Sequence, residues 1–309
     1  VNKYKLSSYE TEDNEARIIH PVLATDEVMK NNFTEYYEDD FPDEINIEDI
    51  ANELGDVEPF AITPPDNRQK VSSVSNQEAS IRLLVSRFRT GTKRYGTGVL
   101  VADKYVLTAG HVVYDSRNDG PAIRVAVYAG SNAGTYKKYS LAYKWKIGAD
   151  FQNNSEGDKY LGRGVFDDWA LLECEASMAS VGHMGIISTN SITPMESYTY
   201  YSIGYPFDLN TDEFGPNEGL ENLIGYRMYR TQGKVKATVN PPELPGVINR
   251  PCVVMSDMDF YEGQSGSPIY RSNNGKFYAQ AICLAGRDLL EQNYVLLIND
   301  YLFDIIEGL

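Results

Sequence analysis

The sequence is short of positive charge and has no long apolar run. It contains 28 Lys and Arg against 44 Asp and Glu, for a formal net charge of −16. Nucleic acid is therefore not an expected partner, because phosphates are bound by clusters of Lys and Arg. No apolar stretch approaches the roughly 18–20 residues that a membrane-spanning helix needs, so we expect no membrane partner either.

Cysteine is equally scarce, with only Cys174, Cys252 and Cys283. An odd number leaves at least one outside any intramolecular disulfide, and three cannot form a disulfide framework. There is no CxxC pair, HExxH motif or phosphate loop. Residues 208–219 begin like a calcium loop, but Glu213 and Gly219 occupy the positions that need Gly and Glu. We expect buried apolar thiols, no metal site and no cofactor.

The negative charge is concentrated in residues 1–60. They hold 17 Asp and Glu against 4 Lys and Arg, a net charge of −13 out of −16. Within them, residues 47–54 (IEDIANEL) have apolar residues at helical spacing, and Gly55 is well placed to end a helix. Such a narrow apolar stripe must dock on another surface. We predict an acidic, partly helical segment over residues 1–60 and a separate domain over residues 61–309.

From about residue 79 the sequence consists of short β-rich runs separated by turns. The runs are residues 81–85, 98–101, 105–107, 123–128, 169–172, 198–203, 253–255, 277–284 and 294–298. Many short strands at close spacing indicate an all-β fold, an antiparallel sandwich or barrel, rather than a parallel sheet with crossover helices. Residues 300–306 (DYLFDII) predict a terminal helix with an apolar face.

Three separated motifs contain the residue types of a nucleophilic site. Ser265 lies in a glycine-rich stretch (GQSGSP), His111 follows a β-rich run (in LTAGHV) and Asp168 precedes another (in FDDWALL). A serine hydroxyl needs a base to take its proton, and that base needs a third group to orient it. The chain order His, Asp, Ser is one that chymotrypsin-like proteases use.

Each motif also has a rival or a purely structural interpretation. Ser267 and Asp167 are the alternatives to the neighbouring serine and aspartate. Of the three histidines, His20 lies in the acidic segment and His183 follows a turn of small residues, whereas His111 alone follows a strand. A lone histidine is more often structural. The combination of all three motifs in this order is what favours catalysis.

The glycines around Ser265 fit the same chemistry. Two backbone N–H groups must point at one spot to bind a developing oxyanion, and those of Gly263 and Ser265 are the candidates. Glycine tolerates the unusual φ and ψ angles that such a loop requires. We therefore predict an oxyanion hole at this loop.

On these motifs the sequence resembles the bacterial glutamyl endopeptidases. The matching stretches occur in order over about residues 61–309: GTGVL at 96–100, LTAGHVVYD at 107–115, DWA at 168–170, GYP at 204–206 and MDFYEGQSGSP at 258–268. The resemblance implies two antiparallel six-stranded β-barrels of chymotrypsin type, at about residues 75–185 and 186–300, with a C-terminal helix. It also implies a secreted, extracellular zymogen that acts on polypeptide substrates as a monomer.

The resemblance assigns roles to the three motif residues. It makes His111 the general base, Asp168 its orienting acid and Ser265 the nucleophile, in preference to the rivals Asp167 and Ser267. Residues 61–71 (AITPPDNRQKV) are similar to the family's mature N-terminus. This similarity places the cut by an activating protease near Phe60 and Ala61.

Activation is expected to differ from that of trypsin. Gln264 stands where trypsin-like zymogens have the Asp that pairs with the new ammonium. The resemblance instead implies an N-terminus near the specificity pocket, and we expect the cut to release the acidic segment.

The sequence departs from the family at the pocket. When the sequence is aligned with the family, Cys283 and Phe260 occupy the positions of the family's pocket His and Thr. Glu262 stands where the family usually has glycine. A substrate carboxylate would lose two hydrogen-bonding groups and meet a like charge, so a preference for Glu is not expected. Asp259 would suit a pocket that binds Arg or Lys, although relatives that cut after Glu can carry Asp there too.

The alternative function is a binding module, a protease-like barrel that has lost turnover and holds a partner. The presence of all three motif residues argues against it.

Overall fold

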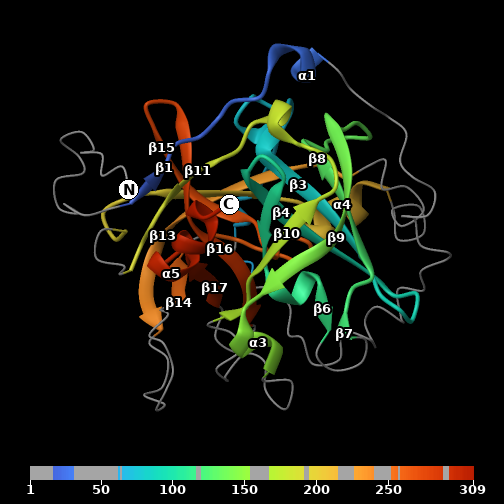
Figure 1. Ribbon diagram of the computed structural model, residues 1–309. Coiled ribbons are helices and arrows are strands. Elements are labelled where there is room, and N and C mark those ends of the chain that lie inside the picture. The colour runs from blue at the N-terminus through green and yellow to red at the C-terminus, as the bar shows by residue number, and fades with distance from the viewer. Residues whose placement is uncertain are drawn as a thin grey trace.

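The structure is a computed structural model that describes most of the chain after residue 64 and a short N-terminal stretch. The described residues are 17–30, 62, 65–115, 120–153, 167–190, 195–214, 226–239, 252–256, 258–287 and 292–309. The predicted helix over residues 47–54 and the predicted cut near Phe60 and Ala61 lie outside them. Strands far outnumber helices in the regular structure of the described residues, which confirms the all-β class (Figure 1).

Six antiparallel strands close into a barrel in the order β10-β5-β4-β3-β8-β9. Their bounds are β3 (Ile81–Arg87), β4 (Lys93–Ala102), β5 (Tyr105–Thr108), β8 (Arg124–Ala129), β9 (Lys138–Ile147) and β10 (Ala170–Cys174). Strand β3 is buried on both faces from Ile81 to Ser86. A short hairpin of β6 (Tyr114–Asp115) and β7 (Gly120–Pro121) follows the end of β5.

The other strands form a second, larger sheet. Its order is β1-β11-β16-β15-β12-β13-β14-β17, with β2 attached to β13. Strand β17, at the end of this order, also pairs with β16. The strands β16-β15-β12-β13-β14-β17 therefore form a continuous ring of hydrogen-bonded neighbours. The bounds are β1 (Ile18–Ile19), β2 (Gln69–Lys70), β11 (Gly185–Ile187), β12 (Tyr200–Gly204), β13 (Tyr229–Val239), β14 (Cys252–Ser256), β15 (Pro268–Asn273), β16 (Lys276–Arg287) and β17 (Gln292–Leu297). The β11–β16 pair is parallel, whereas an antiparallel arrangement was expected.

The helices are short and lie outside the sheets. They are α1 (Asp26–Lys30), α3 (Ala149–Asn153), α4 (Phe207–Phe214) and α5 (Asp300–Glu307), with single turns η2 (Glu78–Ser80), η3 (Gly110–Val112) and η5 (Ala179–Val181). The Asn299 side chain caps α5 by accepting from the N–H of Leu302, and Phe303 is buried in the core. No helix among the described residues has the length and apolar character to cross a membrane.

All nine predicted β-rich runs are strands, and the predicted terminal helix is α5. Of the longer strands, β9, β13 and β15 were not predicted. In β9 and β13, charged side chains interrupt the apolar residues. In β13, burial alternates from Tyr229 to Val235, so Arg230, Gln232 and Lys234 lie on the more exposed face. Cys174 and Cys283 are free and buried, as expected, and burial raises the pKa of Cys174 to about 11.

Candidate active site

His111 and Asp168 meet at one end of the closed barrel. Strands β5 and β10 pair with Thr108 opposite Ala170, so the turn after β5 and the residues before β10 lie side by side. His111 Nδ1 is 2.7 Å from Asp168 Oδ2, and the His111 backbone N–H donates to Oδ1 at 2.9 Å. A Cβ atom at Gly110 would lie 2.9 Å from the same Oδ1, so a side chain there would crowd the carboxylate. Antiparallel pairing thus unites residues 57 apart in sequence.

The neighbouring carboxylate has a different partner. Asp167 accepts a 2.6 Å hydrogen bond from the indole Nε1 of Trp169, and both side chains are buried. The Asp167 carbonyl also accepts from the Trp169 N–H at 2.9 Å. The two adjacent aspartates are therefore separated by geometry, one facing Trp169 and the other His111.

Ser265 lies in the loop before β15, and this loop packs against the closed barrel. Its carbonyl accepts from the Thr97 N–H of β4 at 2.9 Å. The next residue, Gly266, has φ +83°, and a Cβ there would lie 2.2 Å from the Thr97 carbonyl and 2.8 Å from the Ala109 nitrogen. The residue after the serine is thereby packed against Ala109, which lies two positions before His111. The Ser265 hydroxyl donates to the Leu284 carbonyl at 3.3 Å, and no hydrogen bond joins it to His111 in the described part of the chain.

The same loop presents unused backbone donors. The Glu262 carbonyl accepts from the Phe207 N–H at 2.7 Å, and in a trans peptide the following N–H, that of Gly263, points the opposite way. Gly263 has φ +86°, and a Cβ there would lie 2.2 Å from the Tyr205 carbonyl. Neither the Gly263 N–H nor the Ser265 N–H donates to any group among the described residues. Both donors are available to a ligand oxygen.

Comparison with known proteins decides the family. The model of the trypsin-like peptidase domain matches residues 96–279. This chain belongs to the trypsin-like peptidase family.

Solved structures agree on the fold of this peptidase. A Glu endopeptidase in complex with MPD has a TM-score of 0.61 at 18% identity, covering 80% of this chain and 98% of that one. The protease Anisep from Arthrobacter nicotinovorans has a TM-score of 0.52 at 14% identity, covering 77% and 96%. The thermostable serine protease AL20, from an extremophilic microorganism, has a TM-score of 0.51 at 16% identity, covering 74% and 94%. No curated protein matches the sequence.

Two predicted pocket residues of the peptidase lie in one apolar cluster. Phe260 and Cys283 are fully buried there, together with aliphatic and aromatic side chains of β12, β15, β16 and β17. Burial raises the pKa of the Cys283 thiol well above its ordinary value. The two side chains thus contribute apolar surface to this cluster.

The two predicted acidic residues of the pocket differ in their surroundings. Asp259 is buried, and its Oδ2 accepts from the backbone N–H of Asn67 at 2.9 Å. Its own N–H donates to Thr231 Oγ1 at 3.2 Å. Glu262 is partly buried, and this burial, together with the negative charge of Asp208, raises its pKa. Asp259 therefore anchors the chain after residue 64, whereas Glu262 carries an unfavourable charge beside Gly263.

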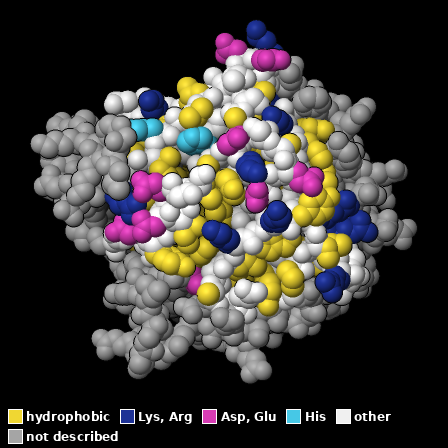
Figure 2. All heavy atoms as spheres, in the orientation of Figure 1, with side chains coloured by type: hydrophobic (Ala, Val, Ile, Leu, Met, Phe, Trp, Pro, Cys, Tyr) yellow, Lys and Arg dark blue, Asp and Glu magenta, His cyan; other side chains and the backbone are white. Residues whose placement is uncertain are grey.

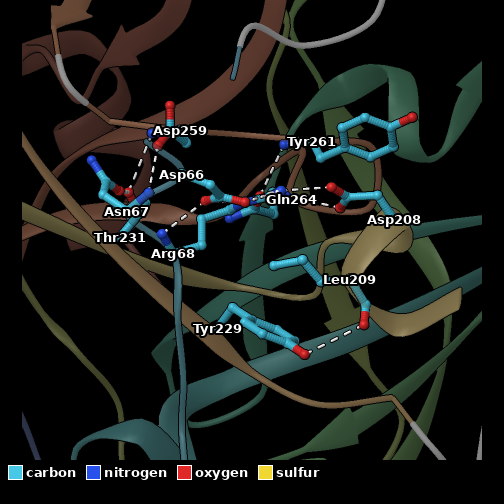
Figure 3. A network of polar contacts seen from close by, with 10 residues as sticks. All are labelled: Asp66, Asn67, Arg68, Asp208, Leu209, Tyr229, Thr231, Asp259, Tyr261 and Gln264. Atoms are coloured by element: carbon cyan, nitrogen blue, oxygen red, sulfur yellow. Dashed lines mark hydrogen bonds and ion pairs between the residues drawn. The ribbon is translucent and has the colours of Figure 1, made fainter. Parts of the chain in front are cut away.

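An ion-pair network that we did not predict from the sequence lies next to the loop that contains Ser265. Figure 3 shows Arg68 between the carboxylates of Asp66 and Asp208, with bonds of 2.8 Å from Nη2 to Asp66 and from Nη1 to Asp208. The Arg68 side chain is only 2% exposed. Burial lowers its pKa, but the two carboxylates outweigh this and raise it above the ordinary arginine value. Its guanidinium carbon is 5.9 Å from the ring centroid of Tyr261, in the segment that leads to Ser265.

The other two histidines contact a hydroxyl and a backbone carbonyl. His20 Nδ1 lies 3.3 Å from the Tyr278 hydroxyl, and His183 Nδ1 lies 3.1 Å from the Met184 carbonyl. His111, by contrast, is paired with a carboxylate, that of Asp168.

Proposed function

We propose that this trypsin-like peptidase is a serine endopeptidase with Ser265 as nucleophile, His111 as general base and Asp168 as the carboxylate that orients the base. The double contact between Asp168 and His111 is the observation that carries the proposal. With Nδ1–H directed at the carboxylate, Nε2 is the nitrogen left to accept a proton. The carboxylate also stabilises the imidazolium that forms when the proton arrives.

The reaction begins when the Ser265 hydroxyl rotates about χ1 from the Leu284 carbonyl to His111 Nε2. Its oxygen bonds to the carbonyl carbon of the substrate peptide, its proton passes to Nε2, and the carbonyl electron pair moves onto the oxygen. The N–H groups of Gly263 and Ser265 then donate to this oxyanion. Expulsion of the amine breaks the C–N bond, and the imidazolium supplies the amine's proton. Water repeats the sequence and releases the acyl group.

A fluorophosphonate probe tests the nucleophile directly, because only an activated serine reacts quickly. We expect a probe adduct on Ser265 in the wild-type chain and in Ser267→Ala, and none in Ser265→Ala. The binding-module alternative draws support from one observation, the bond from the Ser265 hydroxyl to Leu284 instead of His111. A folded wild-type chain that does not react with the probe, before or after cutting within residues 31–61, would favour that alternative.

We also propose that the peptidase prefers neutral or basic residues over Glu before the cleaved bond. Phe260 and Cys283 offer no strong donor to a substrate carboxylate, and the negative charge of Glu262 repels it. Asp259 already accepts from Asn67. Cleavage profiling on a peptide library tests this preference, and dominant cleavage after Glu contradicts it.

We propose further that the chain is a secreted zymogen cut near Phe60 and Ala61 by another protease. The contacts of Asn67 with Asp259 and of Arg68 with Asp208 support this, because they hold the start of the domain beside the nucleophile loop. Asn67 lies six positions after Ala61, a span of about 22 Å at most. The ammonium formed by the cut would therefore lie within reach of the pocket.

The zymogen proposal is tested by comparing ester turnover before and after a controlled cut. A recognition sequence for a site-specific protease, placed so that cutting leaves Ala61 as the new N-terminus, allows both states to be measured on one preparation. We expect turnover to rise on cutting. Equal turnover, with the uncut sample shown by mass to be intact, contradicts the proposal.

A further inference from the structure

The N-terminal stretch from Arg17 to Thr25 runs along the outer edge of the second sheet. Strand β1 pairs with β11, with Ile18 opposite Ile187 and Ile19 opposite Ile186. The backbone contacts continue on both sides of the strand: Val22 exchanges hydrogen bonds of 3.0 and 2.8 Å with His183, the Thr25 N–H donates to the Ser180 carbonyl, and the Ser188 N–H donates to the Arg17 carbonyl. In Figure 1 this blue segment passes from β11 to α1 across the outside of the fold.

Side chains reinforce this backbone pairing at both ends. Arg17 forms ion pairs with Asp304 and Glu307 of α5, and its guanidinium lies 4.6 Å from the ring centroid of Phe303. Ile18 is buried in a small cluster with Ile187 and Tyr278. At the other end, Lys137 donates to the Met29 carbonyl at 2.9 Å. The segment is therefore fixed to both sheets and to the C-terminal helix.

The receiving surface lacks side chains where the segment crosses it. A Cβ at Gly182 would lie 2.1 Å from the Val22 carbonyl, and a Cβ at Gly185 would lie 2.8 Å from Pro21 Cδ. Gly182 also has φ +66°, a conformation that other residues rarely adopt. Gly182 is thus required by the closeness of the N-terminal segment, whereas a side chain at Gly185 would also meet the Tyr278 ring at 2.6 Å. The close fit at Gly182 indicates a matched contact rather than loose covering.

Charge separates this stretch from the rest of the acidic segment. Residues 17–30 carry two acidic and two basic side chains, hence no net charge, whereas residues 31–60 hold eleven acidic residues and no Lys or Arg. Figure 2 shows side chains of both signs over α1, at the top of the face drawn there. Residues 17–30 therefore resemble part of a folded domain in their balance of charges. The excess negative charge begins only after them, in residues 31–60.

We propose that residues 17–30 are a lasting part of the peptidase domain, so that a cut between residues 30 and 62 leaves the N-terminal piece bound as a second, non-covalent chain. This rests on the proposed function only in assuming that such a cut occurs. Loss of the piece would leave β11 as an open edge strand with unpaired backbone groups, and would uncover Ile187 and Tyr278. Strand addition of this kind supplies backbone hydrogen bonds together with side-chain pockets. Activation then frees the new N-terminus near the pocket without releasing the acidic piece.

The experiment uses the full chain with Ser265→Ala, which prevents self-cleavage, and a site-specific protease sequence placed within residues 31–60. After cutting, the sample is separated by size-exclusion chromatography in native buffer, and mass spectrometry identifies the pieces that each fraction contains. We expect the two pieces to elute together in equal amounts and to separate only in denaturant. Elution of the N-terminal piece on its own in native buffer overturns the proposal.

Two charge-reversal variants show whether retention uses the contacts described. Arg17→Glu places a negative charge between Asp304 and Glu307, and we expect the cut piece to dissociate at least tenfold faster on dilution. Lys30→Glu makes the same charge change at an exposed position, so its piece should dissociate at the wild-type rate. Equal rates for both variants would show that the pieces are held elsewhere.

Ile18→Asp tests the buried contact, and a cut chain that keeps its piece as firmly as wild type argues against the β1 docking. Because retention is measured by mass on an inactive chain, its failure leaves the protease proposal untouched. Absence of activation on cutting, conversely, leaves retention untouched.

Discussion

Asp168 holds His111 through two separate hydrogen bonds, one to the imidazole Nδ1 and one to the backbone N–H. The backbone bond fixes the carboxylate relative to the turn, so the side-chain bond can set the imidazole's orientation and tautomer. Asp168→Asn keeps the shape and the backbone contact, but its amide can donate to Nδ1 and so leave the proton on Nε2. We expect kcat to fall on the order of 10⁴-fold with little change in Tm.

The adjacent carboxylate provides the matched control. Asp167→Ala removes the acceptor of the buried Trp169 indole N–H, which costs about 1–3 kcal/mol of unfolding free energy. We expect a lower Tm and near-normal kcat for the folded fraction, the reverse of Asp168→Asn. Denaturant unfolding and active-site titration measure the two quantities separately. If Asp167→Ala proves the less active of the two, the assignment of the orienting acid is wrong.

The nucleophile has a similar internal control. Ser265→Ala and His111→Ala should each remove most activity, and the double variant should be no worse than either single one, because the residues act as a unit. Ser267 lies two residues away, and its hydroxyl is buried without a partner in the described part of the chain. Ser267→Ala should therefore retain kcat and leave stability unchanged or slightly raised. A dead Ser267→Ala with an active Ser265→Ala would reverse the two assignments.

Candidates for the site could be chosen from the sequence where the signal was local. His111 and Ser265 each stand in a short motif of small and glycine residues, and Asp168 directly precedes a β-rich run. Their contact depends on the pairing of β5 with β10, which no local pattern specifies. The choice of Asp168 over Asp167 came from the resemblance, and the indole of Trp169 supplies its physical reason.

What the sequence concealed were contacts between distant polar residues. Arg68 and Asp208 are 140 positions apart, and in the sequence each resembles an ordinary surface charge. Only the fold brings the two together in a part-buried ion pair. The docked stretch from Arg17 to Lys30 was missed for a different reason. Averaging charge over residues 1–60 hid a neutral, apolar piece inside an acidic segment. Charge counted over shorter windows would have separated the two.

The buried contact between Phe260, Cys283 and their apolar cluster leads to a specificity prediction. Phe260→Thr with Cys283→His introduces the two residues expected from the resemblance to glutamyl endopeptidases and should move cleavage toward Glu, measured as the ratio of kcat/KM for Glu and Leu peptides. The same change places polar groups among aliphatic side chains, so Tm should fall. Phe260→Leu keeps the apolar character and serves as the control, with the wild-type ratio expected. Strong wild-type cleavage after Glu, unchanged in the double variant, would locate the pocket elsewhere.

Glu262 makes the stability of the protein depend on pH. Burial and the nearby charge of Asp208 raise the pKa of its carboxyl, so the folded chain binds this proton more tightly than the unfolded chain. The favourable contribution is fully present below the unfolded pKa of about 4.3 and is lost as pH rises through the folded value. Glu262→Gln removes the charge, so we expect a higher Tm than wild type at pH 7–8 and no difference near pH 4.

Glu173 supplies the control of opposite sign. It is partly exposed, and its hydrogen bond to Lys104 lowers the pKa of its carboxyl, so its charged form is the one favoured by folding. Glu173→Gln should therefore lose a little stability at pH 7–8, and high salt should reduce the loss because solvent reaches both side chains. Thermal unfolding of both variants between pH 4 and pH 8 gives the comparison. A Glu262→Gln gain that stays constant down to pH 4 would mean that packing, not charge, accounts for the effect.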